Sequence, residues 1–411
     1  MIDLVEKNKE YILDIIAQGY EGEGIAKIDN TFPVFIEGAL VGEKVKVKIV
    51  KSKKSFAYGK LVEVMEQSKE RCTPECGIYK KCGGCNMLHI DYDFQKKLRT
   101  QILSDLFLQQ GIDVQNQIEI ISGQNYNYRC RFQLNNGGLS ERSSNNIIPI
   151  EQCYCAEKKI NEYLQNTPFD KRPEGRIPLF GSEFSENNVM IYQEKQSFQE
   201  KNTSYIKNGR KQKIKKNVHF AGTVYSPENS ITVMLNGKNI SFDVRGFFQS
   251  NLFVFEKVLN LIVQNLEGGK NILDMYAGCG SISAFLSDLY ENVVLVEHNR
   301  DALVYAEQNL IGKKHTSFGM SGASWIKNCA STCQPFDACV IDPPRSGMEK
   351  EVCDYLCNSN IKKIISLSCD PSTHARDCKK LIEAGYKIKK IYLLDFYPNT
   401  SHIESLVVFQ K

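Results

Sequence analysis

Long hydrophobic runs are missing from this 411-residue sequence, in which hydrophobic residues make up 42% and charged residues 24%. No apolar stretch approaches the length of a membrane span, and the first residues, MIDLVEKNKEY, mix both signs of charge instead of forming the apolar core of a signal peptide. We therefore expect a cytoplasmic protein that acts away from membranes, as a monomer with two or three domains. Its fifteen cysteines should be reduced, metal-bound or catalytic rather than disulfide-paired.

Net charge is also low, at +4, but the lysines are unevenly distributed. The range 44–60 contains seven lysines and no acid, and the range 207–216 contains five lysines and Arg210. One such run usually marks a solvated surface, whereas two runs in a nearly neutral chain predict basic patches that face nucleic acid. The second run lies in a polar stretch, 202–217, that we expect to be a long surface loop.

Short β-strands are predicted over residues 11–66, where glycines separate apolar stretches. Lys44 to Ile49 alternates between lysine and an apolar residue, which is the pattern of a half-buried strand. These patterns predict a small barrel with a lysine-rich outer face. The segment resembles the TRAM domain, an OB-like RNA-binding module, through Gly22-Glu23-Gly24, Phe35-Ile36-Glu37-Gly38-Ala39 and Gly42-Glu43-Lys44-Val45.

Four cysteines have spacings that suit a metal centre: Cys76, Cys82 and Cys85 in a C-x5-C-x2-C arrangement, and Cys153 downstream. Four thiolates can hold zinc or an iron–sulfur cluster. The two C-x2-C pairs of a zinc ribbon are absent, so we favour a [4Fe–4S] cluster. Cys72 and Cys155 are further thiols nearby, and they leave the choice of ligands open.

A helix is predicted from Phe94 to Gln110, because its apolar residues have helical spacing and Gly111 is a stop signal. Downstream, short strands are predicted, including Tyr128 to Phe132 and Ile231 to Leu235. The expected domains are 1–66 for the barrel, 67–93 with 118–245 for a β-rich central domain, and 94–117 with 246–411 for a catalytic domain.

From Asn271 onward, strands alternate with helices. The strand Asn271 to Tyr276 runs into Ala277-Gly278-Cys279-Gly280-Ser281 and a helix, and a second strand ends at Glu297 about twenty residues later. This order predicts a nucleotide-binding βαβ unit, in which the glycines admit the ligand and Glu297 accepts its ribose hydroxyls. The third glycine of a dinucleotide site is missing. The loop is instead typical of a Rossmann-like α/β methyltransferase that binds S-adenosylmethionine.

Two further strands are predicted to end in reactive side chains. Ala338 to Ile341 leads into Asp342-Pro343-Pro344-Arg345, and Ile364 to Leu367 leads into Ser368-Cys369-Asp370-Pro371. Open α/β sheets bind ligands at the carboxyl ends of their strands, and a thiol on a tight turn there is partly exposed and able to ionise. Cys369 is therefore a candidate nucleophile, although a single cysteine among fifteen is more often a buried structural residue.

Taken together, the motifs resemble the RNA uracil-C5 methyltransferase family over nearly the whole chain. The motifs are Gly246-Phe247-Phe248-Gln249-Ser250-Asn251, Leu273-Asp274-Met275-Tyr276-Ala277-Gly278-Cys279-Gly280, Val296-Glu297, Asp342-Pro343-Pro344-Arg345-Ser346-Gly347, Ser368-Cys369-Asp370-Pro371 and Asp395-Phe396-Tyr397-Pro398-Asn399-Thr400-Ser401-His402-Ile403-Glu404. The resemblance implies that Cys369 is the nucleophile and Glu404 the general base. It also implies that the methyl donor is bound by Gln249, Tyr276, Gly278, Ser281, Glu297 and Asp342.

The TRAM-like segment and the four cysteines are typical of the branch of the family that acts on 23S ribosomal RNA, at a uridine that is unpaired or flipped out. Three positions depart from the family pattern. Asp370 follows the nucleophile in place of asparagine, Ser281 replaces an asparagine after the glycine loop, and Gly322 stands where an acid or amide is usual. We expect the carboxylate of Asp370 to raise the pKa of the Cys369 thiol.

The chemistry requires these residue types. Uracil C5 becomes nucleophilic only after a thiolate adds to C6, and a carboxylate must later remove the C5 proton. Three alternatives stay open: a uracil-C5 methyltransferase acting on the T-loop of tRNA, a cytosine-C5 methyltransferase, and an RNA-binding homologue with weakened catalysis. The second usually has its nucleophile in a Pro-Cys turn, which is absent around Cys369.

Overall fold

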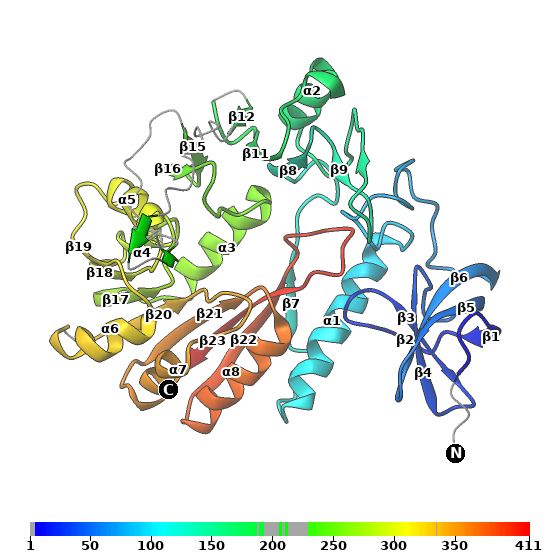
Figure 1. The fold of residues 1–411 in the computed structure, drawn as a ribbon. Coiled ribbons are helices and arrows are strands. Elements are labelled where there is room, and N and C mark those ends of the chain that lie inside the picture. Colours follow the sequence, from blue (N-terminus) through cyan, green and yellow to red (C-terminus); the bar gives the residue numbers. More distant parts are fainter. Residues whose placement is uncertain (1–4, 187–188, 193–204, 208–209, 213–228, 334) are drawn as a thin grey trace.

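A computed structural model describes residues 5–186, 189–192, 205–207, 210–212, 229–333 and 335–411. The structure contains a curled N-terminal sheet, a small central β-rich unit and a large α/β unit (Figure 1). Among the described residues, none of the helices combines the length and the hydropathy that a membrane span needs.

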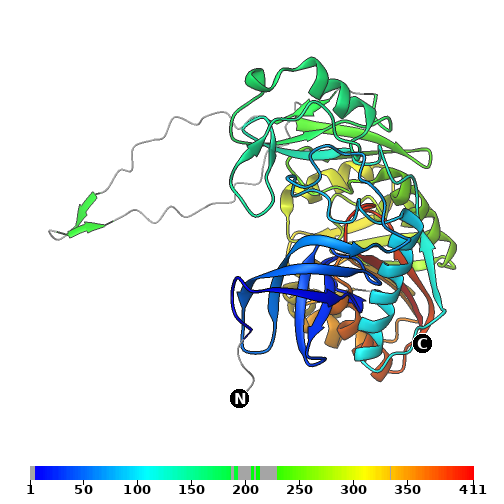
Figure 2. The same cartoon turned by 90° about the vertical axis from the view of Figure 1, so that its right-hand side faces the viewer.

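The N-terminal six-stranded sheet curls into a small barrel (Figure 2). Val45, Val47 and Ile49 are fully buried in its core, so the predicted alternation in this strand is confirmed. The strand order is β1-β5-β6-β4-β3-β2. The strands are β1 (Glu10–Asp14), β2 (Ala17–Gln18), β3 (Gly24–Ile28), β4 (Phe32–Glu37), β5 (Lys44–Ser52) and β6 (Ala57–Glu66).

The central unit has short strands and a few helical turns around a core of its own that includes Phe132, Leu134, Ile160 and Leu179. Its elements are β8 (Arg131–Asn135), β9 (Leu139–Ser140), β10 (Ile147–Ile148), α2 (Lys158–Asn166), η1 (Phe169–Lys171), β11 (Arg176–Phe180) and β12 (Met190–Ile191). The strand predicted from Tyr128 to Phe132 therefore begins later, at Arg131.

Most of the predicted surface loop 202–217 lies outside the described residues, as does most of the second basic run. Within it, the backbone forms a short antiparallel hairpin of β13 (Tyr205–Lys207) and β14 (Arg210–Gln212). After it, β15 (Ser230–Leu235) pairs with β16 (Lys238–Asp243), which confirms the strand predicted at Ile231 to Leu235.

The large unit is an eight-stranded sheet in the order β19-β18-β17-β20-β21-β23-β22-β7. All neighbours are parallel except β23, which runs antiparallel to β21 and β22. The strands are β7 (Ile118–Ile121), β17 (Gly269–Met275), β18 (Tyr290–Val296), β19 (His315–Phe318), β20 (Ala338–Ile341), β21 (Lys363–Ser368), β22 (Lys387–Leu394) and β23 (Glu404–Gln410). The segment at Ile118 was expected in the central domain, but β7 pairs with β22 and forms the edge of this sheet.

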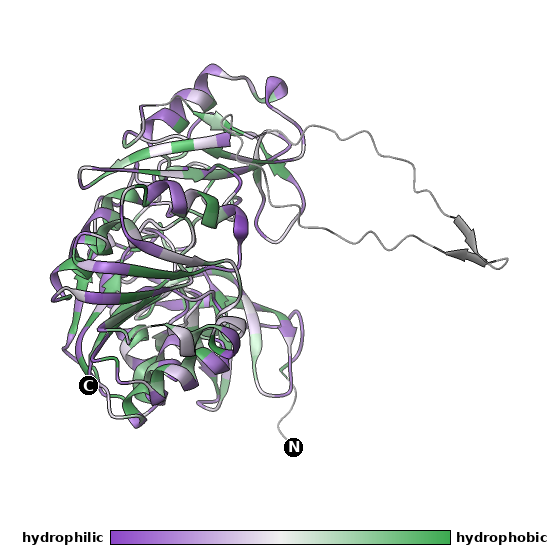
Figure 3. Ribbon diagram, turned by 90° about the vertical axis from the view of Figure 1, so that its left-hand side faces the viewer, coloured by the Kyte–Doolittle hydropathy of each residue, from purple (hydrophilic) through white to green (hydrophobic). Residues whose placement is uncertain are grey.

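Successive side chains of the sheet enter two separate cores because they alternate between its faces. Ile272 packs against one layer of helices, whereas Leu273 packs against the other. Figure 3 shows the resulting concentration of hydrophobic residues along the strands. The helices are α1 (Tyr92–Gln109), α3 (Leu252–Gln264), α4 (Ser283–Leu286), α5 (Arg300–Asn309), α6 (Gly322–Asn328), η3 (Ala330–Thr332), α7 (Lys350–Asn358) and α8 (Pro371–Glu383).

Helix α1 lies between the barrel and the large sheet (Figures 1 and 2). It ends at Gln109, close to the predicted end, and Gly111 follows in the left-handed conformation with a φ of 80°. Phe94 and Leu98 of the helix pack against a buried cluster that contains Leu40 of the barrel. On its other side, Arg99 forms a buried ion pair with Asp395, at 2.7 Å. The helix therefore connects the barrel to the loop that precedes β23.

Candidate active site

The glycine loop after β17 departs from ordinary backbone conformations. Tyr276, Gly278 and Gly280 have φ values of 65°, 57° and 73°. At Gly280, a Cβ atom would lie only 2.9 Å from the Cβ of Ala306 in α5, so glycine is needed for the close approach. Together these conformations turn the chain sharply at the carboxyl end of the strand, where the sequence predicted the donor site.

Glu297, at the end of β18, faces this loop with a fixed carboxylate. One oxygen accepts a hydrogen bond from the Gly278 backbone N–H at 2.9 Å, and the other accepts one from the Asn299 N–H at 2.6 Å. The side chain is buried. Nδ1 of His298 also lies 3.1 Å from the oxygen that binds Asn299. The oxygen that binds Gly278 keeps a second lone pair, so it can accept a ribose hydroxyl without giving up its backbone partner.

Two other predicted donor residues are Tyr276, which follows β17, and Gln249, which lies shortly before α3. The side-chain oxygen of Gln249 is buried and has no hydrogen-bond partner within the described protein, which fits a position that a ligand would satisfy. The hydroxyl of Tyr276 accepts a hydrogen bond from the Glu349 backbone N–H at 3.2 Å.

Asp274, a buried carboxylate in β17, links this strand to the helix after the glycine loop, and it is not among the predicted site residues. Asp274 is 1% exposed and accepts a hydrogen bond from the hydroxyl of Ser283, the first residue of α4. Burial raises the pKa of Asp274 to about 7. The signal for this residue is present in the sequence, because an acid inside an apolar strand must find a partner.

Two of the departures from the family pattern have different structural settings. Ser281 lies in the loop between Gly280 and α4, partly buried. At Gly322, a Cβ atom would lie 2.5 Å from Cγ2 of Val352 and 2.7 Å from Oε2 of Glu349. That carboxylate oxygen also accepts a hydrogen bond from the Ala323 N–H at 3.3 Å. A carboxylate is therefore present beside this loop, although it comes from the start of α7.

Cys369 and Glu404 are neighbours at the end of the large sheet where the parallel strands have their carboxyl ends. Ser368, the last residue of β21, is paired with Ser405 of β23, so Cys369 follows one strand where Glu404 begins the other. Asp342 follows β20, the parallel neighbour of β21. The sequence thus predicted the juxtaposition of Cys369 with Asp342, while the antiparallel return of β23 brings Glu404 to the same place.

Burial and neighbouring charges shift the pKa values of the groups around Cys369. The pKa of the Cys369 thiol is raised to about 11, first by burial and then by Glu404 and Asp342, while Arg345 lowers it. Burial and Asp342 raise the pKa of Glu404 to about 8, again against Arg345. Burial raises the pKa of Asp342 to about 6. The site therefore favours neutral forms of its thiol and of Glu404 near pH 7, and Arg345 is its compensating cation.

Asp370 caps a helix, and among the largest influences on the pKa of the Cys369 thiol the predicted effect of Asp370 does not appear. Its side chain accepts a hydrogen bond from the Thr373 backbone N–H at 2.9 Å and so forms the N-cap of α8, with Pro371 in the first turn. The carboxylates that raise the pKa of the Cys369 thiol are Glu404 and Asp342. Aspartate and asparagine cap helices about equally well. The departure from asparagine thus leaves the turn that presents the thiol intact.

The cysteines of the central unit gather in one region. The sulfur atoms of Cys85 and Cys155 lie 3.6 Å apart, and a hydrogen bond between the thiols of Cys153 and Cys155 is the largest influence on the pKa of each. Cys82 is under the electrostatic influence of Cys153 and Cys76. Within the described part of the chain, no three His, Cys, Asp or Glu side chains are arranged to hold a single metal ion.

Known proteins match this chain along its whole length. The TRAM domain matches residues 5–62, and the family described as tRNA (Uracil-5-)-methyltransferase matches residues 326–411. An uncharacterized RNA methyltransferase of Treponema denticola is 31% identical, over 94% of this chain and 96% of its own. The chain belongs to the RNA uracil-C5 methyltransferase family.

Two further relatives of this methyltransferase have named substrates. The 23S rRNA (uracil(1939)-C(5))-methyltransferase RlmD of Aliivibrio fischeri is 25% identical, over 98% of this chain and 97% of its own. The Pyrococcus abyssi tRNA (uracil-54, C5)-methyltransferase, solved in complex with S-adenosyl-L-homocysteine, has the same fold. Its TM-score is 0.71 at 20% identity, over 97% of this chain and all of that one.

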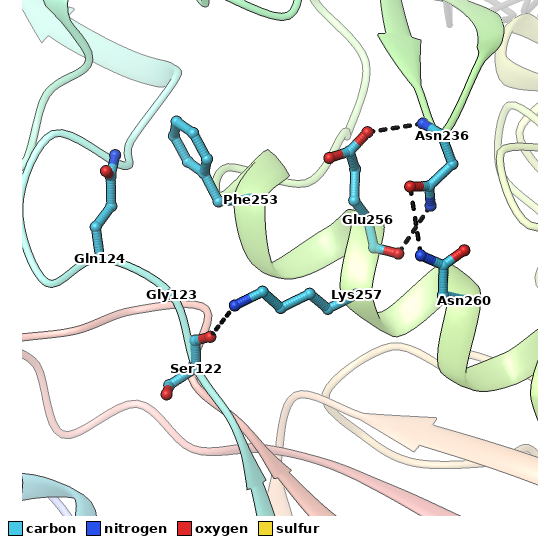
Figure 4. Close-up of a pocket in the computed structure, with 8 residues that line it drawn as sticks. All are labelled: Ser122, Gly123, Gln124, Asn236, Phe253, Glu256, Lys257 and Asn260. Atoms are coloured by element: carbon cyan, nitrogen blue, oxygen red, sulfur yellow. Dashed lines mark hydrogen bonds between the residues drawn. The ribbon is translucent and has the colours of Figure 1, made fainter.

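The methyltransferase also has a pocket of about 390 Å³ that is separate from the predicted site residues and lies beside the start of α3 (Figure 4). Its polar groups bind one another. The Glu256 carboxylate accepts a hydrogen bond from the Asn236 N–H at 2.7 Å, and Lys257 donates to the Ser122 carbonyl at 2.7 Å. None of the predicted site residues lines it, so it is a junction between elements rather than the reaction site.

Proposed function

We propose that this methyltransferase forms 5-methyluridine in 23S ribosomal RNA through a covalent bond between Cys369 and uracil C6. The observation that carries the proposal is the pairing of Ser368 with Ser405, which holds Cys369 beside Glu404 at the edge where the donor loop ends. The Aliivibrio relative, which matches nearly the whole chain, supports ribosomal RNA as the substrate.

Cys369 begins the reaction. Its thiolate adds to C6 of uracil and generates an enolate, which makes C5 nucleophilic enough to take a methyl group. Because the pKa of the free thiol is about 11, only a small fraction is ionised at neutral pH. Arg345 is the positive group that acts on this thiol, and we assign it the stabilisation of both the thiolate and the developing enolate.

Glu404 completes the reaction. After C5 has been methylated it still carries its proton, and a carboxylate beside it can remove that proton while the C6–sulfur bond breaks and the thiolate leaves. A carboxyl group whose pKa is about 8 is a stronger base than an ordinary carboxylate and can release the proton again near neutral pH. Asp342, which follows the strand between β17 and β21, would hydrogen-bond the donor or the uracil edge.

The donor in this proposal is S-adenosylmethionine, which supplies an electrophilic methyl group when bound. Glu297 would accept hydrogen bonds from its ribose, and the free side-chain oxygen of Gln249 would accept one from a donor group. Tyr276, Gly278 and Ser281 would form the loop that lines the site. Tyr276 and Gly278 have left-handed backbone conformations, and a Cβ atom at Gly278 would meet no other atom within 4 Å, so there is room for a ligand beside this glycine.

The barrel would hold the RNA that flanks a flipped-out uridine, with the protein acting as a cytoplasmic monomer. Not every lysine of its basic run is free to bind phosphate, since Lys46 is paired with Glu10 at 2.8 Å and Lys44 lies 3.5 Å from Glu66. Lys51, Lys53 and Lys54 make no ion pair with any described acid. The end of β5 and the turn after it therefore present the free positive charge that phosphates would contact.

We further propose that Cys76, Cys82, Cys85 and Cys153 hold a [4Fe–4S] cluster, which would brace the central unit. The proposal rests on the C-x5-C-x2-C spacing, which lacks the two C-x2-C pairs of a zinc ribbon, and on the gathering of these cysteines in one region. Purified anaerobically, the protein should contain iron and acid-labile sulfide. Cys153→Ser should lose both and Cys155→Ser should keep them; stoichiometric zinc without sulfide contradicts the proposal.

A second candidate substrate is the T-loop uridine of tRNA. The family match at residues 326–411 is described by that activity, and a tRNA enzyme shares the fold over 97% of this chain. That full-length likeness means that the domain architecture alone does not separate the two substrates.

Tritium release tests the proposed function and separates the candidates. The protein is incubated with methyl donor and transcripts of 23S ribosomal RNA or tRNA that carry 5-³H-uridine. Release from the ribosomal transcript alone supports the proposal, whereas release from tRNA alone supports the alternative. Absence of release from both transcripts, with bound RNA, indicates an RNA-binding homologue without uracil methylation.

A further inference from the structure

The turn between β2 and β3 of the barrel is linked by hydrogen bonds to the loop between β22 and β23, which is called the catalytic loop below because it leads into Glu404. The side chain of Asn86, next to Cys85, donates a hydrogen bond to the Glu21 carbonyl at 2.7 Å and another to the Ser401 hydroxyl at 2.9 Å. Its amide oxygen accepts one from the Ser401 N–H at 2.8 Å. One side chain therefore joins the barrel to the loop that leads into Glu404.

The turn itself is rigid. Gln18 donates to the Gly22 carbonyl at 2.7 Å and to the Ala39 carbonyl at 3.1 Å, while its own oxygen accepts from the Val41 N–H at 3.1 Å. Gly22 has a φ of 87°, and a Cβ atom there would lie 3.2 Å from both Asn86 and Ser401. The turn is thus held from the barrel side and packed closely from the catalytic side.

At the tip of this turn stands Tyr20, an aromatic residue that is 38% exposed. Burial raises the pKa of Tyr20 to about 12, and the charges of Asp370 and Cys369 contribute to this rise while Arg345 opposes it. The ring is therefore within electrostatic reach of the candidate nucleophile, although it lies 349 positions earlier in the chain. It is neutral at physiological pH and still open to solvent on one side.

We propose that Tyr20 is an RNA-binding residue of the active site, whose ring stacks on the nucleotide next to the target uridine. An exposed aromatic ring on a rigid support is the usual platform for an unpaired base, because every base has a flat face. A flipped-out uridine leaves its neighbour unstacked, and a preorganised ring at that point replaces the missing stacking partner at little entropic cost. The barrel would thereby position the target as well as bind its flanks.

This inference rests on the proposed function, and the test keeps the two apart. Short RNA containing 5-fluorouridine at the target blocks proton removal, so the covalent adduct accumulates and can be counted on a denaturing gel. If the unmodified protein forms no adduct, the proposed function fails whatever Tyr20 does. If it forms one, the Tyr20 variants are then compared.

Tyr20→Ala should raise the RNA concentration needed for half-maximal adduct about 5- to 100-fold, the range expected when one base loses its stacking partner. The maximal rate should change less, and Tyr20→Phe should behave like the unmodified protein. The same comparison is then made on RNA with an abasic residue on either side of the target. On one of the two abasic RNAs, Tyr20→Ala and the unmodified protein should need the same RNA concentration.

Tyr58→Ala is the matched control, since Tyr58 is a barrel tyrosine of similar exposure, 41%, that packs against Phe35 and Phe56. Whatever its effect on affinity, that effect should be the same on intact and abasic RNA. Three results would overturn the proposal: normal affinity of Tyr20→Ala, an equal loss on intact and both abasic RNAs, or a loss in Tyr20→Phe as large as in Tyr20→Ala.

Discussion

Cys369 and Glu404 lie side by side because Ser368 of β21 is paired with Ser405 of β23. Cys369 directly follows one strand and Glu404 begins its antiparallel neighbour, so a single backbone register sets their separation. A shift of that register by one residue would turn every side chain of β23 to the opposite face. The thiol and the carboxylate are thus positioned by the sheet rather than by a flexible loop.

The pH should act on two separate steps, on adduct formation through Cys369 and on release of the methylated product through Glu404. The thiolate fraction of Cys369 grows about tenfold for each unit by which the pH rises toward its pKa of about 11, and Glu404 gains its basic form as the pH rises through about 8. We expect single-turnover methylation to rise steeply between about pH 6 and 8. Rapid-quench measurements of methyl transfer over this range check it, and a rate that falls with rising pH would count against attack by the thiolate of Cys369.

The thiol pKa should respond in opposite directions to two substitutions. Glu404→Gln removes a negative charge near Cys369, so the thiol pKa should fall and alkylation by iodoacetamide near pH 8 should be roughly threefold to tenfold faster. Arg345→Ala removes the positive charge and should slow the same reaction. Mass spectrometry of the peptide containing Cys369 isolates this thiol from the others. Equal alkylation in both variants would refute the electrostatic account of the site.

Asp370 should behave as a helix cap. Asp370→Asn keeps an acceptor for the Thr373 N–H and should leave the thermal unfolding temperature nearly unchanged, whereas Asp370→Ala should cost about 1 kcal/mol of stability. Calorimetry of the three proteins measures this difference. If asparagine destabilises as much as alanine, the negative charge of Asp370 has a role beyond capping.

The free lysines of the barrel should contribute affinity and little chemistry. Charge reversal of Lys51, Lys53 and Lys54 should weaken RNA binding and lower the slope of log affinity against log salt by about 0.7 for each phosphate that the protein no longer neutralises. Turnover at saturating short RNA should stay close to normal. Lys46→Glu is the comparison, since Lys46 is already paired with Glu10. A large loss of turnover in the triple variant would contradict this division of roles.

The parts of the site that sequence predicts are those on parallel strands. Asp342 and Cys369 follow apolar strands directly, so the general rule for α/β sheets brings them together. The neighbours of Cys369 from distant segments could not be read in this way. The edge position of β7, the attachment of the barrel turn by Asn86, and the approach of Tyr20 depend on packing between units. The capping role of Asp370 was readable, because aspartate before proline is a usual helix start.

The most direct test of the covalent mechanism compares Cys369→Ala with Glu404→Gln on RNA and methyl donor labelled in the methyl group. Cys369→Ala should form no adduct and transfer no methyl, because C5 is never activated. Glu404→Gln should add to C6 and methylate C5 but fail to release the product, so labelled RNA should stay attached to the protein and run as a shifted band on a denaturing gel. Normal turnover by both variants would contradict the account.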